Sequence, residues 1–442
     1  MGVMAQKITR RQALYLAVAA SLAIGGGLTY FFLQPTQQPG QASSPTQTSG
    51  QATRPKLTVL GRSAYHQEIH AALMEYYNNK KQPVEFNYVP KGYSEAYQTA
   101  VLAMRNRSSD YDVLYLDEPW LYEFYVNGWL SPLGDVDTSG VPQLIAEMGE
   151  YRGTVYALPI TGNFNFLFYN EALLAKVNES RPKSWDDVLR ISEEVTKRLA
   201  PGAYGWSSLY SSVATDLYIT VLLSLGGYLF DPKDRVTPMI DSSEAVEALK
   251  IVRDLASSKR AHPKTTSWSS LTEYSDAILN GEIALGAVWS GWVKDVDNPQ
   301  RSKVVGQIYI VPMPGKRPVS QTGVWYLAVS AYSKNQDLAK DYIKTVTSYE
   351  AQKYAYFKAG LPVTRINIYE DPEVQRSSRL AKMFVEIAKA AVPARTSPIY
   401  IKLEPELSSI INKVVLGQLT PEAAAAQMQK LLLEESKKAG LL

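Results

Sequence analysis

Short hydrophobic strands and helix-like segments alternate in the first part of the chain. Residues 56–60 and 84–89 have the apolar pattern of strands, and residues 111–116 form a short apolar run typical of a buried parallel strand. Residues 65–78 and 93–104, which lie between them, carry apolar side chains at helical spacing. Strand, helix, strand, helix, strand is the doubly wound α/β pattern, so the sequence predicts an α/β fold.

In such folds, ligands bind outside the carboxyl ends of the strands. The loops that follow Leu60 and Leu116 are therefore candidate binding loops. Their candidate side chains are Ser63, Tyr65, Asp117, Glu118 and Trp120. A carboxylate can accept hydrogen bonds from two hydroxyl groups while an indole ring stacks on the C–H face of a sugar. Asp117 before Pro119 is also a good helix start, so a structural role for the acidic pair stays open.

Helical segments dominate after Trp185, and further strands are predicted at residues 283–288, 307–311 and 324–330. The first of these strands runs directly into Trp289-Ser290-Gly291-Trp292. The chain has 442 residues, which is too many for one compact core. We therefore expect two packed lobes.

The N-terminal segment has the pattern of a membrane anchor. Basic residues up to Arg11 precede an uncharged apolar run over residues 13–33, which is long enough to cross a bilayer as a helix. Basic residues on the N-terminal side alone place the N-terminus in the cytoplasm and the body outside. We expect residues 1–33 to be an uncleaved anchor, with a cleaved signal and a secreted protein as the alternative. Residues 34–55, rich in Gln, Ser, Thr and Pro, are expected to be a flexible linker.

The amino-acid composition bears on which kinds of ligand and site the protein can have. The formal net charge is +3, from 46 basic and 43 acidic residues, so no strong field favours nucleic acid. The chain has no cysteine, which excludes disulfides, thiolate metal sites and thiol nucleophiles. It has 29 tyrosines and 8 tryptophans against only 10 phenylalanines, and aromatic rings with a polar atom suit concave, hydrated binding surfaces.

Catalytic and metal-binding motifs are weak. His66 and His70 are four residues apart, but a zinc hydrolase helix needs its glutamate directly after the first histidine, whereas this chain has Glu68. The sequence contains no G-x-S-x-G nucleophile motif and no phosphate-binding glycine loop. We therefore expect no metal, no cofactor and no catalysis. Asp117 and Glu118 would suit a glycoside hydrolase only if two carboxylates faced each other across roughly 5–10 Å, and that alternative stays open.

Short motifs follow one another in a fixed order along the body of the chain. They are Asp112-Val113 with Asp117, Trp120 and Phe124; Gly153 to Pro159; Phe168-Tyr169-Asn170; Ser184 to Asp187; Asn280 to Ala284 with Trp289; Gly323-Val324-Trp325; and Gly360 to Arg365. In this order they resemble extracellular solute-binding protein family 1, the carbohydrate receptors of ABC importers. The resemblance covers nearly everything after Arg54.

The resemblance implies a type II periplasmic-binding-protein-like fold, in which two hinged α/β lobes close on a ligand. It places the first lobe at residues 56–160 and 312–347, and the second lobe at residues 161–311 and 348–442. Arg365 is expected to be structural, because an arginine after such a turn often pairs with a carboxylate.

The resemblance also implies binding residues. Trp289 and Trp325 would be stacking platforms, and Asp117 and Glu118 would accept hydrogen bonds. The other candidates are Tyr65, Asn163, Asn165, Trp206, Tyr210, Asp216, Trp292 and Tyr326. Of these, Trp206, Tyr210 and Asp216 lie in a variable stretch and match no motif of the family.

The function that follows is a monomeric, extracellular, membrane-anchored component of an ABC importer. It would bind a mono-, di- or oligosaccharide between its lobes and deliver it to the permease subunits. A receptor for another solute, such as an oligopeptide or a polyamine, explains the same features apart from the stacking tryptophans. A surface glycoside hydrolase is the third alternative.

Overall fold

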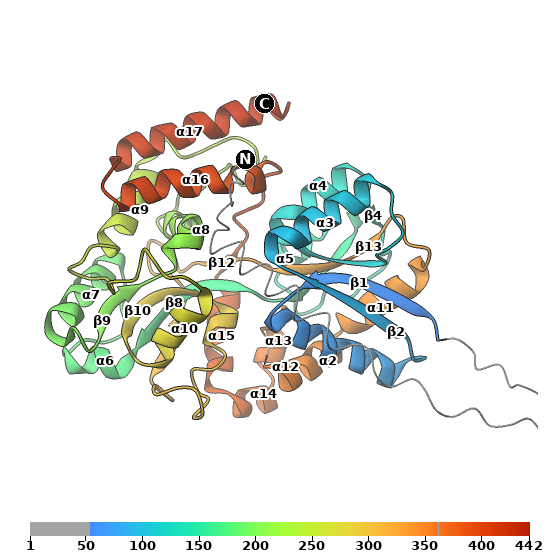
Figure 1. Ribbon diagram of the computed structural model, residues 1–442, viewed down its shortest axis with the longest axis horizontal. Coiled ribbons are helices and arrows are strands. Elements are labelled where there is room, and N and C mark those ends of the chain that lie inside the picture. The colour runs from blue at the N-terminus through green and yellow to red at the C-terminus, as the bar shows by residue number, and fades with distance from the viewer. Residues whose placement is uncertain (1–53, 361) are drawn as a thin grey trace, which may run out of the picture. The chain divides into compact units, whose positions relative to one another are not determined.

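The computed structural model describes residues 54–360 and 362–442 (Figure 1). The predicted anchor over residues 13–33 and nearly all of the predicted linker lie outside this range. In the part of the chain that the structure does describe, no helix combines the length and apolar character needed to cross a bilayer. Residues 54–442 form one compact unit, and it contains two large mixed sheets.

The first sheet has the strand order β2-β1-β3-β13-β4, with β7 also paired to β13. Its strands are β1 (Lys56–Arg62), β2 (Glu85–Lys91), β3 (Val113–Asp117), β4 (Leu130–Ser131), β7 (Ala157–Thr161) and β13 (Trp325–Ser330). The strands β1, β2 and β3 are parallel, as the alternating pattern predicts, and β13 joins antiparallel to β3. We call this sheet and its helices the first lobe.

Helices cover both faces of the first sheet. In Figure 1, α3, α4 and α5 lie on one side of it and α2, α11 and α12 on the other. The helices are α2 (Tyr65–Lys80), α3 (Tyr93–Arg105), α4 (Leu121–Val126), α5 (Gln143–Met148), α11 (Gln336–Val346) and α12 (Tyr349–Ala359), with the short helix η1 (Glu118–Trp120) after β3. A two-stranded sheet of β5 (Glu150–Tyr151) and β6 (Thr154–Val155) completes the lobe.

The second sheet has the order β14-β12-β8-β10-β9, with β11 also paired to β8. Its strands are β8 (Phe164–Asn170), β9 (Tyr204–Ser207), β10 (Ile283–Trp289), β11 (Ile308–Val311), β12 (Ser320–Thr322) and β14 (Ala391–Val392). Every residue of β8 and β10 is buried; β10 is a continuous run without polar side chains, whereas β8 contains the buried Asn165 and Asn170. This sheet and its helices form the second lobe.

The helices of the second lobe pack against one another as well as on the sheet. They are α6 (Glu171–Lys176), α7 (Trp185–Leu199), α8 (Tyr210–Ser224), α9 (Ser243–Leu255), α10 (Leu271–Leu279), α13 (Ile366–Tyr369), α14 (Pro372–Ser377), α15 (Arg379–Lys389), α16 (Tyr400–Val415) and α17 (Pro421–Lys438), with η2 (Ser290–Val293) after β10. In α7, the Ser184 side chain accepts from the Asp187 amide, which caps the helix where the sequence turns helical.

The chain passes between the lobes three times; the third passage lies between α12, which packs on α2, and α15, which packs on β11, and the first two are adjacent segments. It leaves the first sheet at Thr161 and enters the second at Phe164, and it returns between Thr322 and Trp325. The two segments are joined by the Gly323 amide, which donates to the Asn163 carbonyl at 2.8 Å. A pair of adjacent connecting segments is a suitable hinge for two rigid bodies.

The lobe boundaries differ from the sequence-based ones at two places. β12 still pairs with β8 in the second sheet, so the return falls at Gly323 and not near residue 312. α12 packs on α2 of the first lobe, although the sequence assigned everything after residue 348 to the second lobe. In both cases the pairing partner is distant in sequence, and local apolar patterns carry no information about it.

Arg365 has the structural role that the sequence predicts. Its side chain is buried and its Nη1 forms an ion pair with Asp137 at 3.2 Å. Its Nε and Nη2 donate to the backbone carbonyls of Thr347 and Asp137 at 2.9 and 2.7 Å. These contacts tie two loops of the first lobe together.

Candidate functional site

A cavity of about 340 Å³ lies between the two lobes. The first lobe contributes Arg62, Tyr65, His66, Tyr93, Asp117 and Trp325, and the second contributes Leu209, Asp216, Leu271, Trp289, Trp292, Arg395 and Glu404. Asn163 and Gly323, on the connecting segments, complete the lining. The cavity is therefore built by both lobes and by the hinge itself.

Two indole rings from different sheets line the cavity. Trp325 begins β13 and is paired in register with Asp117, the last residue of β3. Its ring is held from behind by Trp120, with ring centroids 5.2 Å apart. Trp289 ends β10 of the second sheet. Because both residues stand at strand ends, their rings reach the space between the lobes.

The Asp117 carboxylate accepts hydrogen bonds from three donors. Its Oδ2 accepts from the Tyr93 hydroxyl at 2.8 Å, and its Oδ1 accepts from the Glu118 amide at 3.0 Å and from Arg395 Nη2 at 3.4 Å. The amide contact caps η1, so the predicted helix start is present. The same carboxylate also lines the cavity.

Arg395 joins the lobes through that ion pair. It follows β14 in the second lobe, is buried, and lies 5.6 Å from the centroid of the Trp289 ring. Burial alone would lower the pKa of its guanidinium, but the carboxylates of Asp117 and Asp216 raise it overall. The arginine therefore stays charged inside the protein.

Because Gly323 has no side chain, both Trp289 and Arg395 can pack against it. A Cβ atom on Gly323 would lie 2.8 Å from Cζ3 of Trp289 and 2.9 Å from Nη2 of Arg395. We expect Gly323→Ala to push the indole from its position and to weaken ligand binding about 10-fold or more, with a stability loss of about 1–3 kcal/mol from overpacking.

Calorimetric titration of the variant with a ligand measures the loss of affinity. Gly92→Ala is the matched control, because a Cβ there meets nothing within 4 Å; equal affinity of the two variants would contradict the account.

Glu118 does not line the cavity. Its side chain is buried, and its Oε2 accepts from the Thr322 hydroxyl of the second lobe at 2.6 Å. Burial raises the pKa of this carboxyl to about 7, and Arg395 and the Thr322 contact only partly offset that. Glu118 is therefore a contact between the lobes beside the hinge, in place of the ligand acceptor that the sequence predicts.

This shifted pKa gives a prediction about stability. A carboxyl whose pKa is higher in the folded than in the unfolded chain binds more protons when folded, so stability falls as pH rises from about 4.5 to about 7. We expect Glu118→Gln to remove about 3 kcal/mol of that loss. Denaturant unfolding at several pH values measures it, and an unchanged pH profile in the variant would refute the assignment.

Seven of the sequence-predicted residues line the cavity. They are Tyr65, Asp117, Asn163, Asp216, Trp289, Trp292 and Trp325. Most of them follow a strand or lie on a connecting segment between the lobes, where the strand-end rule and the family motifs both point.

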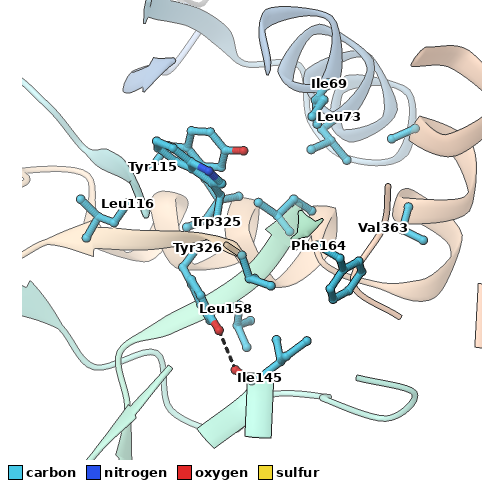
Figure 2. Close-up of a cluster of buried hydrophobic side chains, with 14 of the residues drawn as sticks. Ile69, Leu73, Tyr115, Leu116, Ile145, Leu158, Phe164, Trp325, Tyr326 and Val363 are labelled. Atoms are coloured by element: carbon cyan, nitrogen blue, oxygen red, sulfur yellow. Dashed lines mark hydrogen bonds between the residues drawn. The ribbon is translucent and has the colours of Figure 1, made fainter. Parts of the chain in front are cut away.

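The other predicted residues lie elsewhere. Trp120 supports Trp325 from behind, and the Ser63 amide donates to the Lys91 carbonyl in a loop. Tyr326 faces the opposite side of β13 from Trp325, where its hydroxyl donates to the Ile145 carbonyl (Figure 2). Successive strand residues point to opposite faces, so only one of this pair can reach the cavity.

Three predicted residues belong to the second lobe's interior. The Trp206 Nε1 donates to the Tyr210 hydroxyl, which donates to the Val252 carbonyl, and both rings are buried in the apolar core. Asn165 is buried in β8 opposite Trp289 and Gln321. These three side chains do not line the interlobe cavity.

Sequence reasoning missed eight lining residues. They are Arg62, His66, Tyr93, Leu209, Leu271, Gly323, Arg395 and Glu404. Arg62 ends β1 and Tyr93 follows β2, so a wider use of the strand-end rule would have found both. Arg395 and Glu404 come from a loop and a helix that carry no local signal.

The two histidines of the weak zinc-like motif are packed as neutral rings. His66 Nδ1 contacts the Tyr115 hydroxyl at 2.9 Å. Burial lowers the pKa of His70 to about 3, and its ring lies against Tyr115. Within residues 54–360 and 362–442, no three histidine, aspartate or glutamate side chains gather in a way that could hold a metal ion.

The comparisons with known proteins agree with this geometry. The family model described as bacterial extracellular solute-binding protein matches residues 61–353. The chain belongs to this family. This solute-binding protein is 25% identical over 368 residues to the "Probable amino-acid ABC transporter periplasmic-binding protein y4oP" of Sinorhizobium fredii, covering 78% of this chain and 81% of the relative.

Solved structures of receptors also superpose on this solute-binding protein. The GacH receptor of Streptomyces glaucescens, solved unliganded and with acarbose, is 25% identical with a TM-score of 0.76, covering 86% of this chain and 99% of that one. Maltose-bound MalE3 of T. maritima is 23% identical with a TM-score of 0.75, covering 85% and 98%. The predicted two-lobed α/β binding-protein fold is therefore confirmed.

Proposed function

We propose that this chain is the extracellular substrate-binding component of an ABC importer, which binds a saccharide between its two lobes and delivers it to the permease. The observation that carries the proposal is the interlobe cavity, where indole rings from both sheets stand beside buried hydrogen-bonding groups. Sugars combine apolar C–H faces with a rim of hydroxyls, and such a lining matches both.

The similar structures support a saccharide. The GacH receptor was solved with acarbose and MalE3 with maltose. The Sinorhizobium fredii relative is named for amino acids, which makes an amino acid the second candidate ligand. The paired tryptophans favour the saccharide, because a small amino acid would leave much of the two ring faces uncovered.

Capture involves movement of the lobes about Gly162 and Gly323. Polar contacts between the lobes include Arg395 with Asp117, Thr322 with Glu118, and Lys294 with Glu68 at 3.3 Å. In this proposal, the apolar run over residues 13–33 holds the receptor at the outer face of the membrane as a monomer.

Binding without turnover distinguishes this function from glycoside hydrolysis. Glu118 faces Thr322 and not the cavity, so the predicted Asp117 and Glu118 pair does not face one substrate bond. We expect one or more mono-, di- or oligosaccharides to raise the melting temperature of residues 54–442, because they bind the folded state. Chromatography of the same samples should recover the sugar unchanged. Product formation, or stabilisation by amino acids alone, would overturn the proposal.

A further inference from the structure

The cavity carries two carboxylates against one guanidinium on its second-lobe wall: Asp216, which is buried, and Glu404, which is half-buried, against Arg395. Three carboxylates line it, those of Asp117, Asp216 and Glu404, and they come from β3, α8 and α16. Arg395 forms an ion pair with Asp117, and its positive charge opposes the rise in the pKa of both Asp216 and Glu404. Asp117 already uses this arginine and the Tyr93 hydroxyl. Asp216 and Glu404 have neutral donors: Gln321 Nε2 at 3.2 Å and the Trp289 side chain for Asp216, and the Tyr400 hydroxyl at 3.3 Å for Glu404.

The second arginine of the cavity, Arg62, lies on the opposite wall, and its Nε also has no hydrogen-bond acceptor among the described residues. The Arg62 guanidinium lies over the rings of Tyr93 and Trp325, 5.1 and 5.3 Å from their centroids, on the first-lobe wall. A cation over aromatic faces is already stabilised by them. Arg62 is therefore not the partner of the carboxylates on α8 and α16.

The two second-lobe carboxylates lack a positive partner of their own. Burial, and then the charge of Asp216, raises the pKa of Glu404 to about 7, although Arg395 opposes the shift. Burial also raises the pKa of Asp216. A cation placed between them would reverse both effects, since an opposite charge favours the ionised form.

A separate observation points to a ligand at the same place. The Arg395 side chain is buried and lines the cavity, yet no acceptor among the described residues lies within hydrogen-bond distance of its Nε. A buried donor of this kind costs free energy unless a partner arrives. The ligand group at this end therefore has an acceptor for Arg395 and a donor for the two carboxylates.

We propose that Asp216 and Glu404 select a saccharide that carries a basic nitrogen, such as an amino sugar, with its ammonium group beside both carboxylates and a neighbouring hydroxyl oxygen on Arg395 Nε. The inference rests on the proposed function, since it names the class of saccharide. A neutral sugar would satisfy Arg395 but would leave the acidic pair without a cation.

Matched neutral and amino sugars test this inference. The full-length protein, in a detergent without a sugar headgroup, is titrated calorimetrically with glucose and glucosamine, cellobiose and fully deacetylated chitobiose, and trehalose and its 2-amino analogue. At a pH of about 7.5, the amino member of a binding pair should bind about 10-fold or more tightly than the neutral one, because charge-assisted hydrogen bonds are roughly twice as strong as neutral ones. Its affinity should fall towards pH about 6, as Glu404 takes up a proton.

Variants connect the preference to the two carboxylates. Glu404→Gln and Asp216→Asn should each remove most of the amino-sugar advantage, whereas Glu406→Gln, an exposed position on the same helix, should keep it. If the neutral member binds equally well or better, or if the advantage survives in both variants, the inference is wrong and the proposed function stands. If no saccharide in this set or in the wider screen binds the folded protein, both are wrong.

Discussion

Replacing Trp289 with alanine is expected to weaken saccharide binding about 30-fold or more, or roughly 2 kcal/mol, the effect typical of a buried aromatic anchor. The indole ends β10, lines the cavity and is held beside Arg395. Its removal takes away the second-lobe stacking face and lets water reach the buried charges. Titration calorimetry with a saccharide from the screen measures the loss.

The control for this substitution is Phe357→Ala, which removes an aromatic ring that is 45% exposed on α12 and lies away from the interlobe cavity. That variant should bind like the unaltered protein. Trp289→Phe should recover part of the affinity, since it restores an aromatic face. An alanine variant that keeps full affinity and a normal melting temperature would show that Trp289 is no ligand platform.

Replacing Arg395 with methionine is expected to destabilise the protein by about 3–5 kcal/mol, the usual cost of leaving a buried ion pair without one partner. Asp117, Asp216 and Glu404 would then line the cavity without the guanidinium that offsets their negative charges. The loss should be smaller at pH about 5 than at pH about 8, because protonation removes the repulsion between the carboxyls. Denaturant unfolding at both pH values measures it.

Arg181→Met is the matched control for this variant. Arg181 pairs with Glu386 at 2.7 Å, but both side chains are 47% exposed, and exposed pairs contribute at most about 1 kcal/mol. Adding Asp216→Asn to Arg395→Met should restore part of the lost stability by removing one of the unpaired carboxylates. Equal effects of the Arg395 and Arg181 substitutions would contradict the central role given to the buried cluster.

Local patterns in the sequence predicted the class of fold well. The parallel strands β1, β2 and β3 were predicted from short apolar runs, and the strand-end rule led directly to Asp117 and Tyr65. The motifs of the family added Trp289 and Trp325. These features are recoverable because each one depends on the residues immediately around it.

The remaining site residues depend on contacts between distant parts of the chain. Arg395 reaches the cavity after β14 pairs with β12, and Glu404 does so because α16 packs on α8. Trp206, which the sequence predicts as a binding residue, is buried in the apolar core of the second lobe, where β9 pairs with β10. Periodicity specifies which face of an element is apolar, but not which element will cover it.

Hydrogen–deuterium exchange with and without a bound saccharide tests the central claim most directly, that the ligand is held by both lobes at once. The account predicts slower exchange in residues 93–120 of the first lobe and in residues 283–293 of the second, together with the segments around Gly162 and Gly323. Protection confined to one lobe, or to the surface away from the cavity, would contradict it.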